Sequence, residues 1–122
     1  MTIKSYQDLR VWQLSFKLGV EVYNALKESK HYSLKDQIQR SAITVPSNIA
    51  EGFERTSNKE YIYFLKVSRA SCAELRTQLL FAGEVGALEL ESSDAFAKKS
   101  QFVSAMLQKL INARKKFKTR DR

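Results

Sequence analysis

Glycine and proline are scarce in this chain, and their scarcity limits the folds that it can adopt. Only four Gly and one Pro occur among 122 residues. A small β-sandwich or barrel reverses direction about every 8 to 12 residues and needs turn formers at most of those points. Hydrophobic residues make up 43 % of the chain and charged residues 28 %, which is ordinary globular usage and excludes disorder along the whole chain. The composition therefore predicts one all-α domain of long helices.

Four segments repeat apolar residues at the three- and four-residue spacing of an amphipathic helix. They cover about 6–30, 34–51, 58–83 and 94–116, and a charged tail, 118–122, follows them. Three segments start with a serine and an acid three residues later, as a helix-capping box does: Ser5 with Asp8, Ser33 with Asp36, and Ser57 with Glu60. The fourth start, at Ser92 or Ser93, is weaker. Short connections force antiparallel neighbours, so we expect an up-down-up-down antiparallel four-helix bundle in a single domain, 1–122.

The spacing also predicts which helix faces form the core. In the first helix the expected core stripe consists of Leu9, Trp12, Phe16, Val20 and Tyr23. A second stripe beside it widens the apolar sector beyond what a small bundle needs, and it consists of Val11, Leu14, Leu18, Val22 and Ala25. The surplus indicates either a central helix or an oligomer.

Three single residues carry further expectations. Pro46 lies inside the second helix and should kink or restart it, because proline has no amide to donate to the carbonyl of Ala42. Gly52 suits the left-handed residue that ends a helix. Cys72 falls in the apolar stripe of the third helix and is expected to be a small buried hydrophobe, not a reactive thiol.

Several functional classes lack the residues that they need. One cysteine forms no intramolecular disulfide and gives no zinc-site spacing, which fits a reducing cytoplasm. The N-terminus has no apolar signal sequence, and the longest uncharged run, 41–50, is about half of a membrane span. A single histidine, His31, excludes a di-iron bundle site, and no glycine-rich phosphate loop occurs. We therefore expect a cytoplasmic protein that is not an enzyme and has no cofactor or metal.

Three motifs together resemble a known family. They are Tyr6-x-x-Leu9-x-Val11-Trp12, the segment 37–52 that ends in Asn48-Ile49-Ala50-Glu51-Gly52, and Ser71-x-x-Glu74-Leu75-x-x-Gln78-Leu79. They resemble the bacterial four-helix-bundle proteins encoded by intervening sequences within 23S ribosomal RNA genes, also called S23-like ribosomal proteins. The resemblance covers residues 6–88, and the fourth helix agrees only in character.

The resemblance implies a homopentamer shaped like a short barrel. A relative, the accessory variability determinant of diversity-generating retroelements, forms such a pentamer and presents basic surface to nucleic acid and to a reverse transcriptase. By resemblance, this chain would therefore associate with itself, with nucleic acid and with a nucleic-acid enzyme such as a reverse transcriptase. The family implies no catalytic activity.

Polar residues of the second and third helices form a candidate network. Arg40, Ser47 and Glu51 share the face of the second helix that is turned away from its apolar residues. The arginine can pair with Glu51 or with Glu74, and nearby amides can complete a network. The two interpretations are a solvated surface row and a network between subunits or helices, and the apolar surplus favours the second. The candidate residues are Gln37, Arg40, Asn48, Glu51, Glu74 and Gln78.

The net charge of +8 lies entirely at one end of the chain. Residues 1–97 carry 12 basic and 12 acidic side chains, whereas residues 98–122 carry nine basic and one acidic. Cations in the last helical turn also stabilise the negative end of the helix dipole, which is a sufficient structural reason for residues 114–116. The candidate nucleic-acid-binding residues are Lys98, Lys99, Lys109, Arg114, Lys115, Lys116, Lys118, Arg120 and Arg122, with Lys66, Arg69 and Arg76 of the third helix.

This charge pattern favours phosphate binding by counterion release, which needs no base-reading element. Aromatic interleaving is limited to Phe117, so base stacking is expected to be minor. The sequence thus predicts a non-enzymatic, oligomeric nucleic-acid-binding protein, with structured RNA favoured over DNA. The alternative is a homo-oligomeric interaction scaffold whose basic tail aids solubility.

Overall fold

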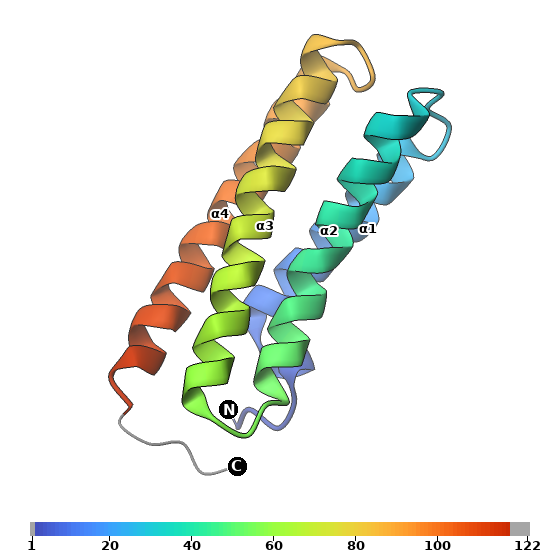
Figure 1. The fold of residues 1–122 in the computed structure, drawn as a ribbon. Coiled ribbons are helices and arrows are strands. Elements are labelled where there is room, and N and C mark those ends of the chain that lie inside the picture. Colours follow the sequence, from blue (N-terminus) through green and yellow to red (C-terminus); the bar gives the residue numbers. More distant parts are fainter. Residues whose placement is uncertain (1, 118–122) are drawn as a thin grey trace.

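The protein is an antiparallel bundle of four long helices. The computed structural model describes residues 2–117. A short 3-10 helix, η1 (Tyr6–Asp8), precedes α1 (Arg10–Leu26), α2 (Tyr32–Phe53), α3 (Asn58–Glu84) and α4 (Leu90–Lys115), and the described residues contain no strand. Successive helices run in opposite directions (Figure 1), each packs on the next, and α1 also packs on α4. The all-α, up-down-up-down bundle is confirmed, while the predicted tail, 118–122, lies outside the described residues.

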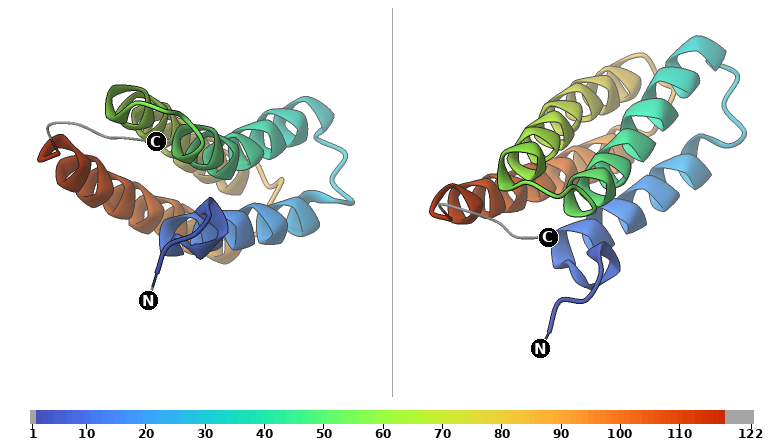
Figure 2. Two further views of the ribbon diagram at one scale, coloured as in Figure 1. Left: turned by 90° about the horizontal axis from the view of Figure 1, so that it is seen from below. Right: turned by 60° about the horizontal axis from the view of Figure 1, so that its bottom comes forward.

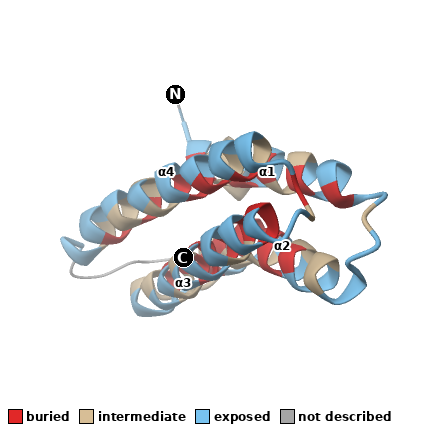
Figure 3. Ribbon diagram, turned by 90° about the horizontal axis from the view of Figure 1, so that it is seen from above, coloured by how far each residue is buried: buried red, intermediate tan, exposed pale blue. Residues whose placement is uncertain are grey.

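The helices form two layers. One layer contains α1 and α4, and the other contains α2 and α3 (Figure 2). Seen along the bundle, the buried faces of the helices turn toward the space between the layers (Figure 3). The 3-10 helix η1, the end of α4 and the α2–α3 connection lie at one end, and the α1–α2 and α3–α4 connections lie at the other (Figure 1).

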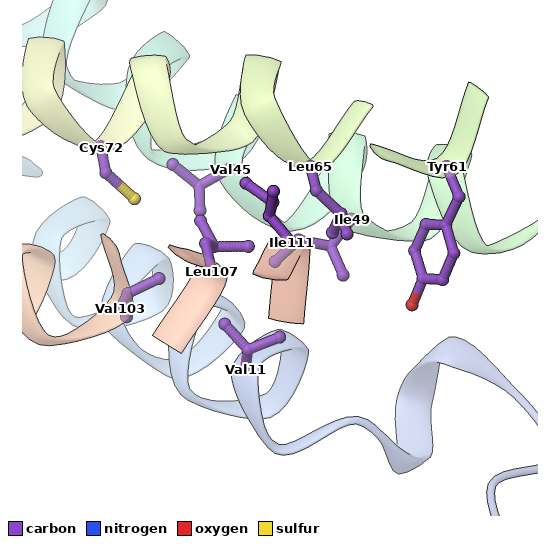
Figure 4. Packing of buried hydrophobic residues seen from close by; sticks show 9 residues of the cluster. All are labelled: Val11, Val45, Ile49, Tyr61, Leu65, Cys72, Val103, Leu107 and Ile111. Carbon is purple, nitrogen blue, oxygen red and sulfur yellow. The ribbon is translucent and has the colours of Figure 1, made fainter. Parts of the chain in front are cut away.

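The core consists of two buried clusters. One receives residues from all four helices (Figure 4): Val11, Val45, Ile49, Tyr61, Leu65, Cys72, Val103, Leu107 and Ile111. The other contains Leu18, Val22, Leu26, Ile38, Ala42, Leu75, Leu79, Ala82 and Leu88. The predicted apolar stripe of α3 is largely confirmed, and with it the burial of Cys72, which is 2 % exposed. Desolvation by this burial raises the pKa of the Cys72 thiol to about 12, so the side chain behaves as a hydrophobe.

The predicted core stripe of α1 is wrong in part. Phe16, Val20 and Tyr23 are each about half exposed, at 49 %, 47 % and 50 %. The buried residues of α1 are Val11, Ser15, Leu18, Val22 and Leu26, so the second apolar stripe supplies the core, although its Ala25 is exposed. The buried face also includes Ser15, whose hydroxyl donates to the carbonyl oxygen of Trp12 at 2.9 Å.

Two of the predicted serine caps are confirmed. At Ser57, Oγ accepts from the amide of Glu60 at 3.1 Å and starts α3. Ser5 and Asp8 form a full capping box, but this box caps the start of η1, and α1 begins only after Leu9.

The other two predicted starts, and one end, are wrong. Helix α2 begins at Tyr32, and neither Ser33 nor His31 caps it with a side chain. Helix α4 begins at Leu90, which places Ser93 in its buried face, and α1 ends at Leu26, not near 30. In α4, Ile111 is fully buried, whereas Phe117 is 51 % exposed.

Pro46 and Gly52 do not interrupt α2. The helix continues through Pro46 without a restart, and the carbonyl group of Ala42 faces Gly19 of α1. Gly52 is not left-handed, since Gly86, at φ 80°, has the only positive φ among the described residues. A Cβ at Gly52 would lie 2.9 Å from Cβ of Phe64, so a glycine is needed there for close packing of α2 on α3.

Candidate nucleic-acid interface

A groove of about 480 Å³ lies between the start of α3 and the end of α4. Three lysines line it, Lys59 and Lys66 from α3 and Lys115 from α4, and no acidic side chain among residues 2–117 does. Two aromatic residues, Tyr63 and Phe117, also line it and are 60 % and 51 % exposed. We call this site the basic groove, and its residues are Asn58, Lys59, Ile62, Tyr63, Lys66, Lys115 and Phe117.

Contacts between the two helix ends hold the groove together. Asn58 Nδ2 donates to the carbonyl oxygen of Arg114 at 2.8 Å, and Arg114 Nε donates back to Asn58 Oδ1 at 2.9 Å. The Arg114 guanidinium also lies 5.3 Å from the ring centroid of Tyr61 and 4.0 Å from that of Phe117. We call Asn58, Tyr61, Arg114 and Phe117 the end clamp. Because the clamp fixes the last turn of α4 against α3, it sets the position of Lys115 beside the α3 lysines.

The structure divides the predicted basic residues among several places. Lys66 and Lys115 meet in the basic groove, whereas Lys98 and Lys99 line a separate groove of about 280 Å³ between α4 and α1. There Lys99 Nζ forms an ion pair with Glu21 at 3.0 Å. The remaining exposed cations of this set are Arg76, Lys109 and Lys116. Lys118, Arg120 and Arg122 lie outside the described residues.

Two predicted arginines are engaged within the fold. Arg69 donates to the side-chain oxygen of Gln108 on α4, and Arg114 belongs to the end clamp. Both are half-buried. Both arginines therefore connect α3 to α4 through their side-chain hydrogen bonds.

The predicted polar network does not close within one chain. Ser41 Oγ donates to Glu74 at 3.1 Å, and Glu51 pairs with Arg55 at 2.6 Å. Arg40 is exposed and forms no ion pair with any described residue. Asn48 Nδ2 donates along its own helix to the carbonyl oxygen of Thr44 at 2.9 Å.

The two glutamines of this network lie in a third groove. Gln37 and Gln78 line a space of about 410 Å³ between α2 and α3, together with Leu34, Thr77 and Phe81. The side-chain oxygen of Gln78 is buried and has no hydrogen-bond donor among the described residues. Most buried polar groups have a hydrogen-bond partner, so this oxygen is an exception within the described part of the chain.

Sequence reasoning missed Asn58 and Tyr63. The signal for Tyr63 was present, because Lys59, Tyr63 and Lys66 follow one another at four- and three-residue steps and so share one helix face. Nothing in the sequence indicated that Asn58 would meet Arg114, 56 residues later.

The described residues contain neither a candidate metal site nor a candidate membrane-spanning helix. Within 2–117, no three His, Cys, Asp or Glu side chains are grouped so that they could hold a metal ion. Over the same range, no helix has the length and apolarity needed to cross a bilayer.

Fold and site define the class as an all-α, four-helix-bundle protein with a cationic groove at one end. Residues 7–109 match the 23S rRNA-intervening sequence protein family, and the chain belongs to that family. A protein of unknown function from the S23 ribosomal protein family of Bacteroides thetaiotaomicron has a similar solved structure, with a TM-score of 0.79 and 22 % sequence identity. The match covers 83 % of this chain and 97 % of that one, and at this identity it shows the fold alone. No curated protein matches the chain.

Proposed function

We propose that this protein is a non-enzymatic nucleic-acid-binding protein that contacts phosphates through the basic groove. The observation that carries the proposal is the meeting of Lys59, Lys66 and Lys115 from two helices in one groove without an acidic lining residue. None of the three forms an ion pair within the described residues, so their charges are free for a ligand. Phosphates of a nucleic acid bind such sites by releasing condensed counterions.

RNA is favoured over DNA as the ligand. The family takes its name from sequences that interrupt a ribosomal RNA, which supports RNA as the polymer that its members meet. Residues 98–117 carry six basic side chains, Lys115 among them, and no acidic one, which would extend the positive field around the groove.

The test is a comparison of two variants with equal net charge. Affinity for a labelled RNA hairpin is measured by fluorescence anisotropy near 50 mM salt. Lys59→Gln, Lys66→Gln and Lys115→Gln together should weaken binding about tenfold or more. The matched control changes Lys4, Lys27 and Lys30, which are exposed outside the groove, to glutamine and should bind nearly as wild type. Equal losses in both variants, or no binding by the wild type, would contradict the proposal.

We also propose that the chain associates with itself through the exposed apolar face of α1 and α2. Phe16, Val20 and Tyr23 of α1 and Ile43 of α2 are between 47 % and 59 % exposed and line one groove of about 380 Å³. Among the described residues, no charged side chain lines this groove. Apolar surface gathered in this way is typical of a protein contact.

The occupant that we propose is a second copy of the chain. Leu80 and Phe81 of α3 are also exposed, at 41 % and 57 %, on a different face of the bundle. Two different apolar faces allow a heterologous contact, and such contacts form a ring when the rotation between neighbouring subunits closes. Such a ring agrees with the pentamer that the family resemblance implies.

Native mass spectrometry tests this assembly. Val20→Glu places a charge in the centre of the α1–α2 face without touching the core and should yield monomers. Tyr32→Glu, at a more exposed site outside that groove, is the control and should keep the wild-type mass. If the wild type is itself a monomer, or if both variants assemble alike, the proposed contact is wrong. A wild type that assembles but binds no RNA would favour the interaction-scaffold alternative.

A further inference from the structure

We infer that the basic groove selects unpaired nucleotides, with an unpaired base stacked on Tyr63 or Phe117 and the adjoining phosphates on the lysines. This inference rests on the proposed nucleic-acid binding and adds the class of ligand. It also changes the expectation from sequence, in which Phe117 alone gave stacking a minor part.

The first observation is the alternation of cations and an aromatic ring along α3. Lys59, Tyr63 and Lys66 occupy one stripe of the helix, and all three line the groove. Tyr63 is 60 % exposed, so most of its side chain is open to a ligand. A single-strand site combines these two elements, since cations follow the backbone while rings receive bases.

The second observation is that both rings are supported by a neighbouring side chain. The Arg114 guanidinium lies 4.0 Å from the ring centroid of Phe117, while 51 % of Phe117 remains exposed. Tyr63 meets Phe64 edge to face, with centroids 5.2 Å apart and planes at 81°. Rings held in this way lose little conformational freedom when a base stacks on them.

The third observation is the size of the groove. Its volume of about 480 Å³ falls within the range of small-molecule sites and suits a nucleotide or two. A duplex keeps its bases inside the helical stack and is recognised mainly by shape and by its phosphates and 2′-hydroxyls. Bases in loops, bulges and free ends are the ones that can reach Tyr63 and Phe117.

The experiment compares two RNA probes against two kinds of variant. The probes are a single-stranded oligoadenylate of about 12 nucleotides and a blunt RNA duplex of the same length. Tyr63→Leu with Phe117→Leu should weaken single-strand binding about tenfold or more, because stacking contributes roughly 1–3 kcal/mol per base. For Tyr63→Leu alone, which leaves the end clamp intact, duplex affinity and the slope of log K against log salt should stay as in the wild type, because no phosphate contact is lost.

A second readout reports stacking directly. A 2-aminopurine base in the single strand should lose fluorescence on binding to the wild type and keep most of it with the aromatic variant. Tyr63→Leu alone is measured in parallel, since Phe117 belongs to the end clamp and Tyr63 does not. The control is Tyr32→Leu, which is 64 % exposed far from the groove and should change neither affinity nor fluorescence.

The outcomes separate this inference from the function on which it rests. Unchanged single-strand affinity in the aromatic variants, or equal losses for both probes, would overturn the stacking inference. The lysine triple variant tests the proposed function itself and should weaken both probes. If it weakens neither, phosphate binding in the groove is wrong, whatever the aromatic variants show.

Discussion

Asn58 and Arg114 hold each other through two reciprocal hydrogen bonds, 2.8 and 2.9 Å long, across 56 residues of sequence. The side-chain amide of Asn58 donates to the carbonyl oxygen of Arg114 in the last turn of α4. This carbonyl is one of the groups that a helix end leaves without an intrahelical donor. The end of α4 is thereby part of the bundle. A truncation after Asn112 would remove this contact together with the basic residues, so a deletion of the tail must begin after Phe117.

Asn58→Ala should destabilise the protein by about 1–2 kcal/mol, because it removes both hydrogen bonds and leaves Arg114 without its carboxamide partner. Urea unfolding followed by circular dichroism measures the loss. Asn24→Ala, at an exposed position of α1, should stay within about 0.5 kcal/mol of the wild type. A similar stability for both variants would mean that the end clamp contributes little.

Gly83→Ala should destabilise the α3–α4 contact by about 1–3 kcal/mol. A Cβ at Gly83 would lie 2.1 Å from Ser93 Oγ and 2.9 Å from Ser93 Cβ, so one of the helices has to move. Gly19→Ala is the matched control, since its Cβ would meet the Ala42 carbonyl oxygen at an ordinary 3.4 Å. Thermal unfolding should lower Tm for the first variant and leave it unchanged or raised for the second.

The Cys72 thiol should resist labelling by a thiol reagent near pH 8 in the native protein and react fully in urea. Burial raises its pKa to about 12, so almost no thiolate forms in the folded state at that pH. Rapid labelling of the native protein would show that α3 opens or that the residue is not buried.

The same shift makes stability depend on pH in alkaline solution. The folded pKa lies above the ordinary value of 9.0, so the contribution of Cys72 is fully present below about pH 9 and declines as the pH rises toward 12. The difference in unfolding free energy between wild type and Cys72→Ala should therefore shrink from pH 8 to pH 10.5. A constant difference over that interval would contradict a raised pKa.

Arg40→Leu should alter assembly more than fold. Arg40 is exposed and unpaired within the described chain, so its loss removes no contact that holds the bundle together. Light scattering should show a changed particle mass, while urea unfolding of the variant stays near that of wild type. Arg10→Leu, also exposed, serves as the control. An unchanged mass would assign Arg40 to the solvated surface.

The sequence predicted the fold well because long helices leave strong periodic signals. The third helix has the clearest signal in the sequence, since it combines the Ser57 cap with an apolar stripe that runs from Tyr61 to Ala82. For α1 the sequence offers two neighbouring apolar stripes, and periodicity alone does not say which of them turns toward the other helices, so the core was assigned to the wrong stripe. Ser15, Ser68, Ser93 and Ser100 lie inside and satisfy their hydroxyls on backbone carbonyls, as Ser68 does on Val45 at 2.8 Å.

The candidate site was predictable only in its parts. Lys66 and Lys115 were both named for their charge, yet their meeting depends on the end clamp, which joins residues far apart in sequence. Charge counting also placed Arg69 and Arg114 with the free cations, although hydrogen bonds occupy both. Periodicity within a helix finds a stripe such as that around Tyr63, but contacts between helices require the fold.

The salt dependence of RNA affinity tests the central claim most directly. Each phosphate contact contributes about −0.7 to −0.9 to the slope of log K against log salt, so the change of Lys59, Lys66 and Lys115 to glutamine should flatten the slope by about 2 to 3. Deletion of residues 118–122 should flatten it further when combined with the triple variant. A triple variant that keeps the wild-type slope would contradict binding in the basic groove. Binding there would also be contradicted if deletion of residues 118–122 by itself removed the salt dependence.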